Sequence, residues 1–193
     1  MSKKIKFVNG EMFEYEILRL VDSYDPILRT PTMPIDFDKM DGRQVSYYGM
    51  SLMETLIHLN GLGLSANQVG IPYRMFSINL GEKIWCLINP VVLERSVGKT
   101  KYKEGCLSFP GLYLEIGRPS SVTVEFQAFN GDKITQTFDG LTATCVQHEM
   151  DHLDGICYTD LVSPIKLEKA KEKARVHGRK VKRWAKQQAL VSN

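Results

Sequence analysis

The stretch CVQHEMDHLDG, residues 145–155, places the strictest constraint on what this chain folds into. In an α-helix, residues four apart lie on the same face, so the imidazoles of His148 and His152 point to a common site. Glu149 lies one position round the helix and reaches a water molecule on a bound ion without ligating that ion. This His-Glu-x-x-His arrangement is typical of zinc hydrolases, whose glutamate acts as general base. It favours a metal site over an ordinary helix with hydrogen-bonded histidines.

A catalytic ion needs a third protein ligand and an open position for water. Downstream of the histidines, the candidate donors are Asp154, Asp160, Glu168, Glu172 and His177. Asp154 follows too soon to aim at the same site, and His177 lies in a basic tail. Upstream, Cys145 shares a helix face with His148 but crowds the site, whereas Cys106 lies in the turn-like stretch KEGCLSFPG. The pattern favours Cys106 over Cys145.

Length and composition suit one globular domain. Of the 193 residues, 43% are apolar and 24% are charged, a balance that disfavours extensive disorder. No run of 18 apolar residues predicts a transmembrane helix, and the N-terminal segment lacks the apolar core of a signal peptide. We therefore expect a cytoplasmic protein whose four cysteines are thiols or metal ligands.

The charge is uneven along the chain. Residues 166–193 carry ten Lys and Arg against two Glu, a net charge of +8, while the rest of the chain has a net charge of −5. A basic segment of this kind is attracted to nucleic acid or another polyanion. On charge alone, a solvated helix is the simpler interpretation.

Three helices are predicted from the spacing of apolar residues. The first covers residues 47–60, and its core face carries Met50, Met53, Leu56 and Ile57. The second, over residues 142–153, carries the sequence HEMDH. The third begins at Pro164, and its apolar face comprises Leu167, Ala170, Ala174, His177, Val181 and Trp184.

The middle of the chain is rich in β-branched and aromatic residues, which favour strands. The predicted strands are 74–80, 84–93, 121–129 and 134–138, the last two joined by the turn sequence NGDK. We expect an α+β fold with antiparallel or mixed strands around the central HEMDH helix, plus a C-terminal helix. The expected division is a catalytic domain at 1–165, a basic helix at 166–190 and a tail at 191–193.

Three stretches occur together in the order GLGLSANQ (61–68), EGCLS (104–108) and QHEMDH (147–152). In this order and spacing the chain resembles the bacterial-type peptide deformylases that carry a basic C-terminal helix, and the resemblance extends over nearly the whole chain. One departure is Ser65, which stands where the family's first motif usually has alanine. Because one small residue replaces another, we expect little consequence.

The resemblance implies a metal-dependent enzyme that removes the N-formyl group from the first methionine of new polypeptides. It implies Cys106, His148 and His152 as ligands of one divalent ion, with Fe(II) as the physiological metal and Zn, Ni or Co as substitutes. Glu149 is then the general acid and base of the hydrolysis. A thiolate ligand suits such borderline metals and leaves the site open to oxidation.

The resemblance also implies how substrate is held. The amide of Gln68 and the backbone N–H of Leu107 are expected to stabilise the oxyanion. Gly61 allows the substrate to approach closely, and Gly63 pairs with it as an added strand. The expected lining of the methionine pocket is Leu62, Leu141 and Cys145.

Roles are also expected for four other side chains and for the charged C-terminal segment. Glu104 and Arg118 are expected to form an ion pair behind the ligands, and Cys86 and Cys157 to be buried strand thiols without chemistry. The basic helix is expected to bind the ribosome near its exit tunnel, and the enzyme to be a monomer. Three alternatives remain open. They are a metallopeptidase that cuts peptide bonds, a non-catalytic ribosome- or RNA-binding protein with a structural metal, and a soluble α+β domain with no metal.

Overall fold

The computed structural model describes residues 3–8 and 10–191, with side chains described as far as Arg179. The helices are α1 (Gly42–His58), α2 (Gly140–Leu153) and α3 (Pro164–Val191), with short 3-10 helices η1 (Pro26–Arg29), η2 (Ala66–Val69) and η3 (Tyr158–Leu161). The strands are β1 (Lys4–Val8), β2 (Glu11–Tyr15), β3 (Gly63–Ser65), β4 (Met75–Asn79), β5 (Ile84–Arg95), β6 (Lys99–Cys106), β7 (Phe109–Pro119), β8 (Ser121–Gln127) and β9 (Lys133–Asp139). The α+β prediction is confirmed.

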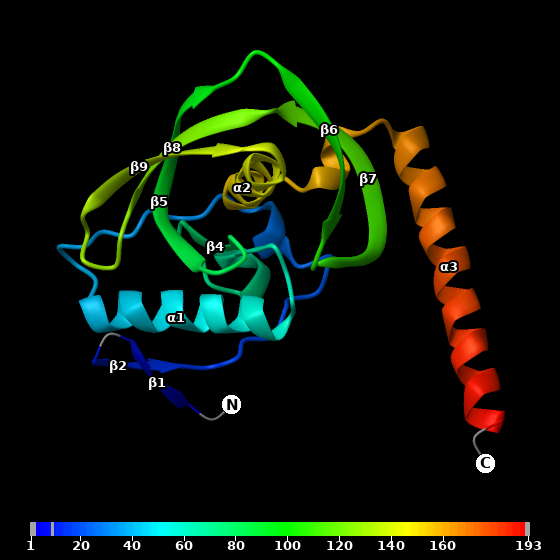
Figure 1. Ribbon diagram of the computed structural model, residues 1–193, viewed down its shortest axis with the longest axis horizontal. Helices are drawn as coiled ribbons and strands as arrows, with labels where there is room; N and C mark the ends of the chain where they lie inside the picture. Colours follow the sequence, from blue (N-terminus) through cyan, green and yellow to red (C-terminus); the bar gives the residue numbers. More distant parts are fainter. Residues whose placement is uncertain (1–2, 9, 192–193) are drawn as a thin grey trace.

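A five-stranded antiparallel sheet in the order β3-β4-β5-β8-β9 packs against both α1 and α2 (Figure 1). Its strand β4 is buried on both faces. Phe76 and Ile78 belong to the apolar cluster of Val146 on α2, while Met75 belongs to the cluster of Leu52 on α1. Full burial of one such side chain contributes about 1.5–3 kcal/mol. The sheet therefore fixes α2, which carries both histidines, at the centre of the molecule.

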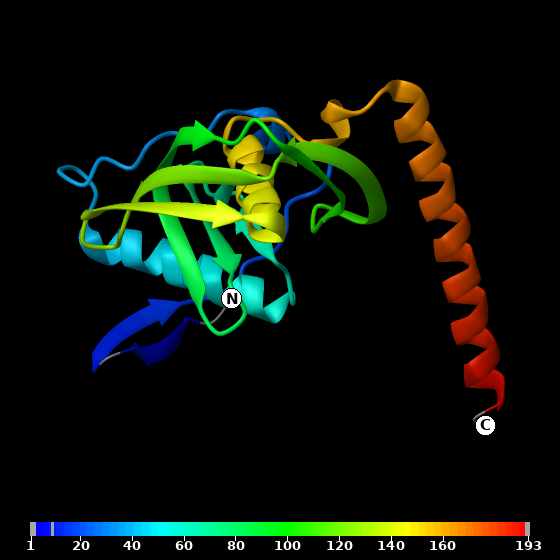
Figure 2. The same ribbon diagram turned by 45° about the horizontal axis from the view of Figure 1, so that its top comes forward.

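The hairpin of β6 and β7 forms a separate two-stranded sheet. The β7 side chains Leu112, Leu114 and Ile116 are buried against Tyr158 of η3, and Leu167 of α3 packs on the same cluster. Figure 2 shows the hairpin curving past one end of α2 toward α3. The third cluster thereby holds the hairpin beside the histidine helix.

Helix α3 begins at Pro164, as the sequence predicts, and in both views it stands away from the rest of the chain (Figures 1 and 2). Leu167, Ala170 and Ala174 are partly buried, whereas His177 is exposed. The prediction for Val181 and Trp184 lies outside the described side chains. Among the side chains described on α3, those that pack lie in its first part.

An N-terminal hairpin, β1 and β2, precedes the first helix, although the sequence predicts no strands there. The hairpin and the segment that follows it are joined to α1 by polar contacts. The backbone N–H groups of Glu16 and Leu18 donate to the hydroxyls of Ser51 and Thr55, at 3.0 and 2.9 Å. Lys6 also pairs with Glu54 of α1 at 2.5 Å.

Several predicted details of the helices and thiols are wrong. The helix expected at 47–60 begins at Gly42, because the Asp41 side chain caps it by accepting from the N–H of Arg43. Ile57 is 49% exposed rather than buried. Cys157 is buried but precedes η3 instead of lying in a strand. Among the described helices, none combines the length and apolar character that a bilayer crossing requires.

Candidate active site

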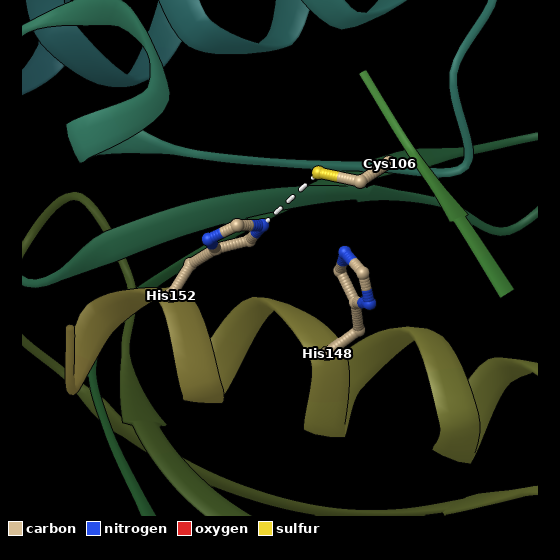
Figure 3. A group of neighbouring side chains, drawn as sticks. All are labelled: Cys106, His148 and His152. Carbon is tan, nitrogen blue, oxygen red and sulfur yellow. Dashed lines mark hydrogen bonds between the residues drawn. The ribbon is translucent and has the colours of Figure 1, made fainter. Parts of the chain in front are cut away.

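Cys106, His148 and His152 come together at the centre of the molecule (Figure 3). The two histidines extend from α2 with ring centroids 5.0 Å apart, and both are buried. Cys106 ends β6, where the register with β7 shifts between Gly105 and Cys106. Bulges of this kind bend a strand and re-aim a side chain. The Cys106 Sγ lies 3.2 Å from Nε2 of His152.

This donor set suits a divalent ion. The three donor atoms all lie within 4.8 Å of one another, close to the largest separation, about 4.6 Å, that two bonds of about 2.3 Å to one ion span. Within the described chain, Nδ1 of His152 is buried without a hydrogen-bond partner. Burial lowers the pKa of His152 well below its ordinary value. The neutral ring that results is the form in which imidazole binds a metal.

The candidate downstream ligands are engaged elsewhere. Asp154 pairs with Arg74, Asp160 with Arg29, Glu168 with Lys171, and Glu172 with Arg175. His177 is exposed on α3. Cys145 is outside the three-donor group and lines the adjoining cavity. Of the candidates weighed from sequence, Cys106 alone joins the two histidines among the described residues.

Behind His148 lies a buried ionic network. Its Nδ1 is 2.8 Å from Glu104 Oε2, which leaves Nε2 for the centre of the site. Arg118 donates two hydrogen bonds to Glu104, at 2.6 and 3.0 Å, and a third to Asp151 at 2.7 Å. Burial opposes ionisation of Glu104, but the bonds to His148 and Arg118 hold its pKa below the ordinary value. A charged partner of this kind orients a ligating ring.

Glu149 is also buried, and its Oε2 has no hydrogen-bond partner among the described residues. Burial raises its pKa to about 7. The opposing wall is Gly63, where an added Cβ would lie 2.8 Å from the Glu149 carboxyl carbon and 2.7 Å from the Cys145 sulfur. Only glycine therefore allows the two segments to approach so closely.

Gln68 has its side-chain amide fixed in one orientation. Its Oε1 accepts from the backbone N–H of Ser65 at 2.9 Å and is 3.1 Å from the Ser65 hydroxyl. Its Nε2 therefore faces Cys106 Sγ at 3.3 Å and the Ser108 hydroxyl at 3.0 Å. Ser65, expected to matter little, lies directly behind the amide. Leu107 follows Cys106 and lines the same cavity.

Sequence reasoning missed three residues around the site. Ser108 accepts from Gln68, Asp151 accepts from Arg118, and Asn67 donates to the backbone oxygen of His152 at 2.6 Å. Asp151 and Asn67 lie inside the motifs HEMDH and GLGLSANQ, and Ser108 ends EGCLS. Because all three residues lie within these motifs, their position in the sequence could have marked them as site residues.

A cavity of about 460 Å³ adjoins the donor cluster, and its lining includes Cys106, His148 and Glu149. All five residues predicted to hold substrate line it, namely Gly61, Leu62, Gly63, Leu141 and Cys145. Leu62 and Leu141 are 56% and 50% exposed and form the rim. Strand β3, which contains Gly63, is the edge of its sheet and pairs with β4 on one side.

Comparison with known proteins identifies the family. Residues 17–168 match the model of the family described as polypeptide deformylase. A peptide deformylase of Agrobacterium fabrum is 40% identical over 147 residues, which are 74% of this chain and 85% of that protein. The structure of a peptide deformylase from Thermotoga maritima is 35% identical and superposes with a TM-score of 0.72, covering 77% of this chain and 99% of that one.

A third relative was solved with a peptide. The class I type b peptide deformylase from Acinetobacter baumannii, bound to Met-Ala-Ser, is 26% identical with a TM-score of 0.71 and covers 76% of this chain and 99% of that one. These matches agree with the three motifs and with the cluster of cysteine and histidines. The chain belongs to the polypeptide deformylase family.

Proposed function

We propose that this chain hydrolyses the formamide bond at the formyl-methionine end of nascent polypeptides and releases formate. The observation that carries the proposal is a three-donor centre beside a cavity whose lining includes two of the donor residues, the buried carboxylate of Glu149 and the oriented amide of Gln68. The family membership supports the same reaction.

Cys106, His148 and His152 would hold one divalent ion, with Fe(II) as the proposed metal and Zn, Ni or Co as substitutes. When bound, such an ion lowers the pKa of a water ligand and so supplies hydroxide near neutral pH. Glu104 orients His148 through its Nδ1. A cysteine sulfur among the ligands favours borderline metals and is itself open to oxidation.

Glu149 accepts the proton of the attacking water and returns it to the amine of the methionine. Its unpartnered, buried Oε2 supports this role, because no described residue competes for the proton. The formyl oxygen becomes negative as the carbon turns tetrahedral, and two donors are proposed to stabilise that charge. They are Nε2 of Gln68, held toward Cys106, and the backbone N–H of Leu107.

The peptide is proposed to bind as an added strand along β3. The outer edge of β3 at Gly63 offers main-chain groups for such pairing, and Gly61 admits the chain beside it. The methionine side chain enters the space lined by Leu62, Leu141 and Cys145. The Acinetobacter relative is bound to Met-Ala-Ser, a tripeptide that begins with methionine, which supports a peptide substrate of this kind.

Anaerobic, iron-loaded protein tests the proposal with formyl-Met-Ala-Ser, with formate and peptide fragments assayed separately. Formate release with the tripeptide left intact is the expected result. Fragments would instead indicate a peptidase, which is the first alternative. If neither formate nor fragments appear, the result would indicate a non-catalytic protein with a structural metal.

The basic helix is proposed to bind ribosomal RNA near the exit tunnel, with the enzyme acting as a cytoplasmic monomer. The proposed division is a catalytic unit at 1–165, the helix at 166–190 and a tail at 191–193. On α3, Lys169 and Lys173 are exposed, and counterion release makes lysine binding to RNA salt-dependent. Co-sedimentation with ribosomes at rising salt, repeated after both lysines are changed to glutamine, tests this. Unchanged sedimentation in the variant would contradict it.

A further inference from the structure

The active-site cavity continues into a second groove between β7 and α3. This groove has a volume of about 830 Å³. Lys103, Gly111 and Tyr113 line both spaces. The active-site cavity lies between β3, at Gly63, and the end of β6, at residues 103–106. A peptide added along β3 therefore also passes β6, and on its way out from Cys106 it reaches this shared border.

The groove is positively charged. Its lining includes the lysines Lys103, Lys166, Lys169 and Lys173, and its described acidic lining residue is Glu115. Lys166 donates to the backbone oxygen of Glu115. Because the lysines outnumber the acids by four to one among these residues, the groove attracts negative charge on a chain that enters it.

Of the groove lysines, Lys103 alone also lines the active-site cavity. It lies three residues before Cys106 on β6, a distance of about 10 Å at a strand's rise of roughly 3.3 Å per residue. Its Nζ stands 5.0 Å from the centre of the Tyr113 ring, and it forms no ion pair within the described chain. Glu115 is its cross-strand neighbour, yet the two side chains are not ion-paired in the described residues.

We propose that Lys103 selects nascent chains with an acidic side chain at the third or fourth position. An extended substrate whose formyl group lies at Cys106 advances by about 3.3 Å per residue, so those positions meet Lys103. A carboxylate there gains an ammonium partner, and a basic side chain meets repulsion. The inference rests on the proposed deformylation and names the substrates that the reaction favours.

Capped peptides of the form formyl-Met-Ala-X-Ala amide and formyl-Met-Ala-Ala-X amide test the proposal, with X as Asp, Asn or Lys. The amide cap removes the terminal carboxylate, which would otherwise mask the effect. At low salt, in one of the two series, we expect kcat/KM to be about threefold higher for the Asp peptide than for the Asn peptide, and about threefold lower for the Lys peptide. An effect of this size is that of an exposed ion pair. It should arise mainly through KM. Added salt reduces both ratios.

Three variants separate Lys103 from the general charge of the protein. Lys103→Gln removes the preference, Lys103→Glu inverts it, and Lys99→Gln retains it. Lys99 is exposed on the same strand and lines neither space. The ratio of Asp to Asn peptide is taken within each variant, so a loss of folded protein cancels.

Equal rates for all three peptides, or a preference that survives Lys103→Gln, would overturn the inference. The Asn peptide also serves as the check on the reaction itself. If it yields formate while charge has no effect, the selection is wrong and deformylation stands. If it yields none, deformylation itself fails.

Discussion

Helices α2 and α3 carry the same kinds of residue in opposite surroundings. On α2, His148, Glu149 and His152 are at most 7% exposed. On α3, Glu172 pairs with Arg175 and both side chains are more than half exposed. Solvent screens the second set, whereas burial strengthens every interaction of the first. The difference teaches that the sheet and the β6–β7 hairpin, rather than residue type, make a histidine or glutamate chemically active.

The largest expected effect is the loss of a proposed ligand. Cys106→Ala removes the sulfur that completes the donor set, so metal content and formate release should both collapse, the latter by about a thousandfold or more, since the ion supplies the hydroxide. His177→Ala on exposed α3 is the control and should leave both unchanged. Full metal content in Cys106→Ala would show that the cluster is not the site.

The next effect separates chemistry from metal binding. Glu149→Gln keeps the size of the side chain and all three donor atoms, so metal content should stay near one ion while kcat falls by about a hundredfold to ten-thousandfold. Glu172→Gln on α3 is the matched control and should keep full activity. A Glu149→Gln protein with near-normal turnover would remove this residue from the reaction.

The buried network should affect stability more than any surface pair. The side chains of Arg118 and Glu104 are 7% and 4% exposed. Arg118→Ala leaves two carboxylates without their partner, and we expect the free energy of unfolding to fall by about 3–5 kcal/mol. Arg175→Ala on exposed α3 should leave the free energy of unfolding nearly unchanged, because solvent screens its pair with Glu172. Chemical denaturation measures the free energy of unfolding of both variants. Equal losses of stability would contradict the contrast between the buried network and the exposed pair.

The success of the sequence predictions also differs between the buried and the exposed parts of the molecule. The strands β4, β5, β8 and β9 and the helix α2 carry strong apolar periodicity because they are buried against each other, and all were found. The hairpin of β1 and β2 is fully exposed along β1. Its charged residues alternate with apolar ones that face solvent, so no inward face marks it. Its order comes from contacts with α1, which are not local in sequence.

The site divides in the same way. Spacing in one helix placed His148 and His152 together, because a helix is a local structure. Spacing alone only favoured Cys106, because its position depends on a bulge and on a hairpin that the sequence did not reveal. The bonds of Ser108 and Asn67 escaped notice because each joins segments far apart in the chain.

The smallest expected effect concerns Ser65. Its hydroxyl and its backbone N–H both lie within hydrogen-bond distance of Gln68 Oε1, at 3.1 and 2.9 Å. Ser65→Ala removes the first contact and keeps the second, so the amide should stay oriented and kcat/KM should fall by about threefold or less, as for one neutral hydrogen bond. Ser163→Ala, just before α3, should leave kcat/KM unchanged. A loss of a hundredfold in Ser65→Ala would mean that the hydroxyl, and not the backbone, holds the proposed oxyanion donor, Gln68, in place.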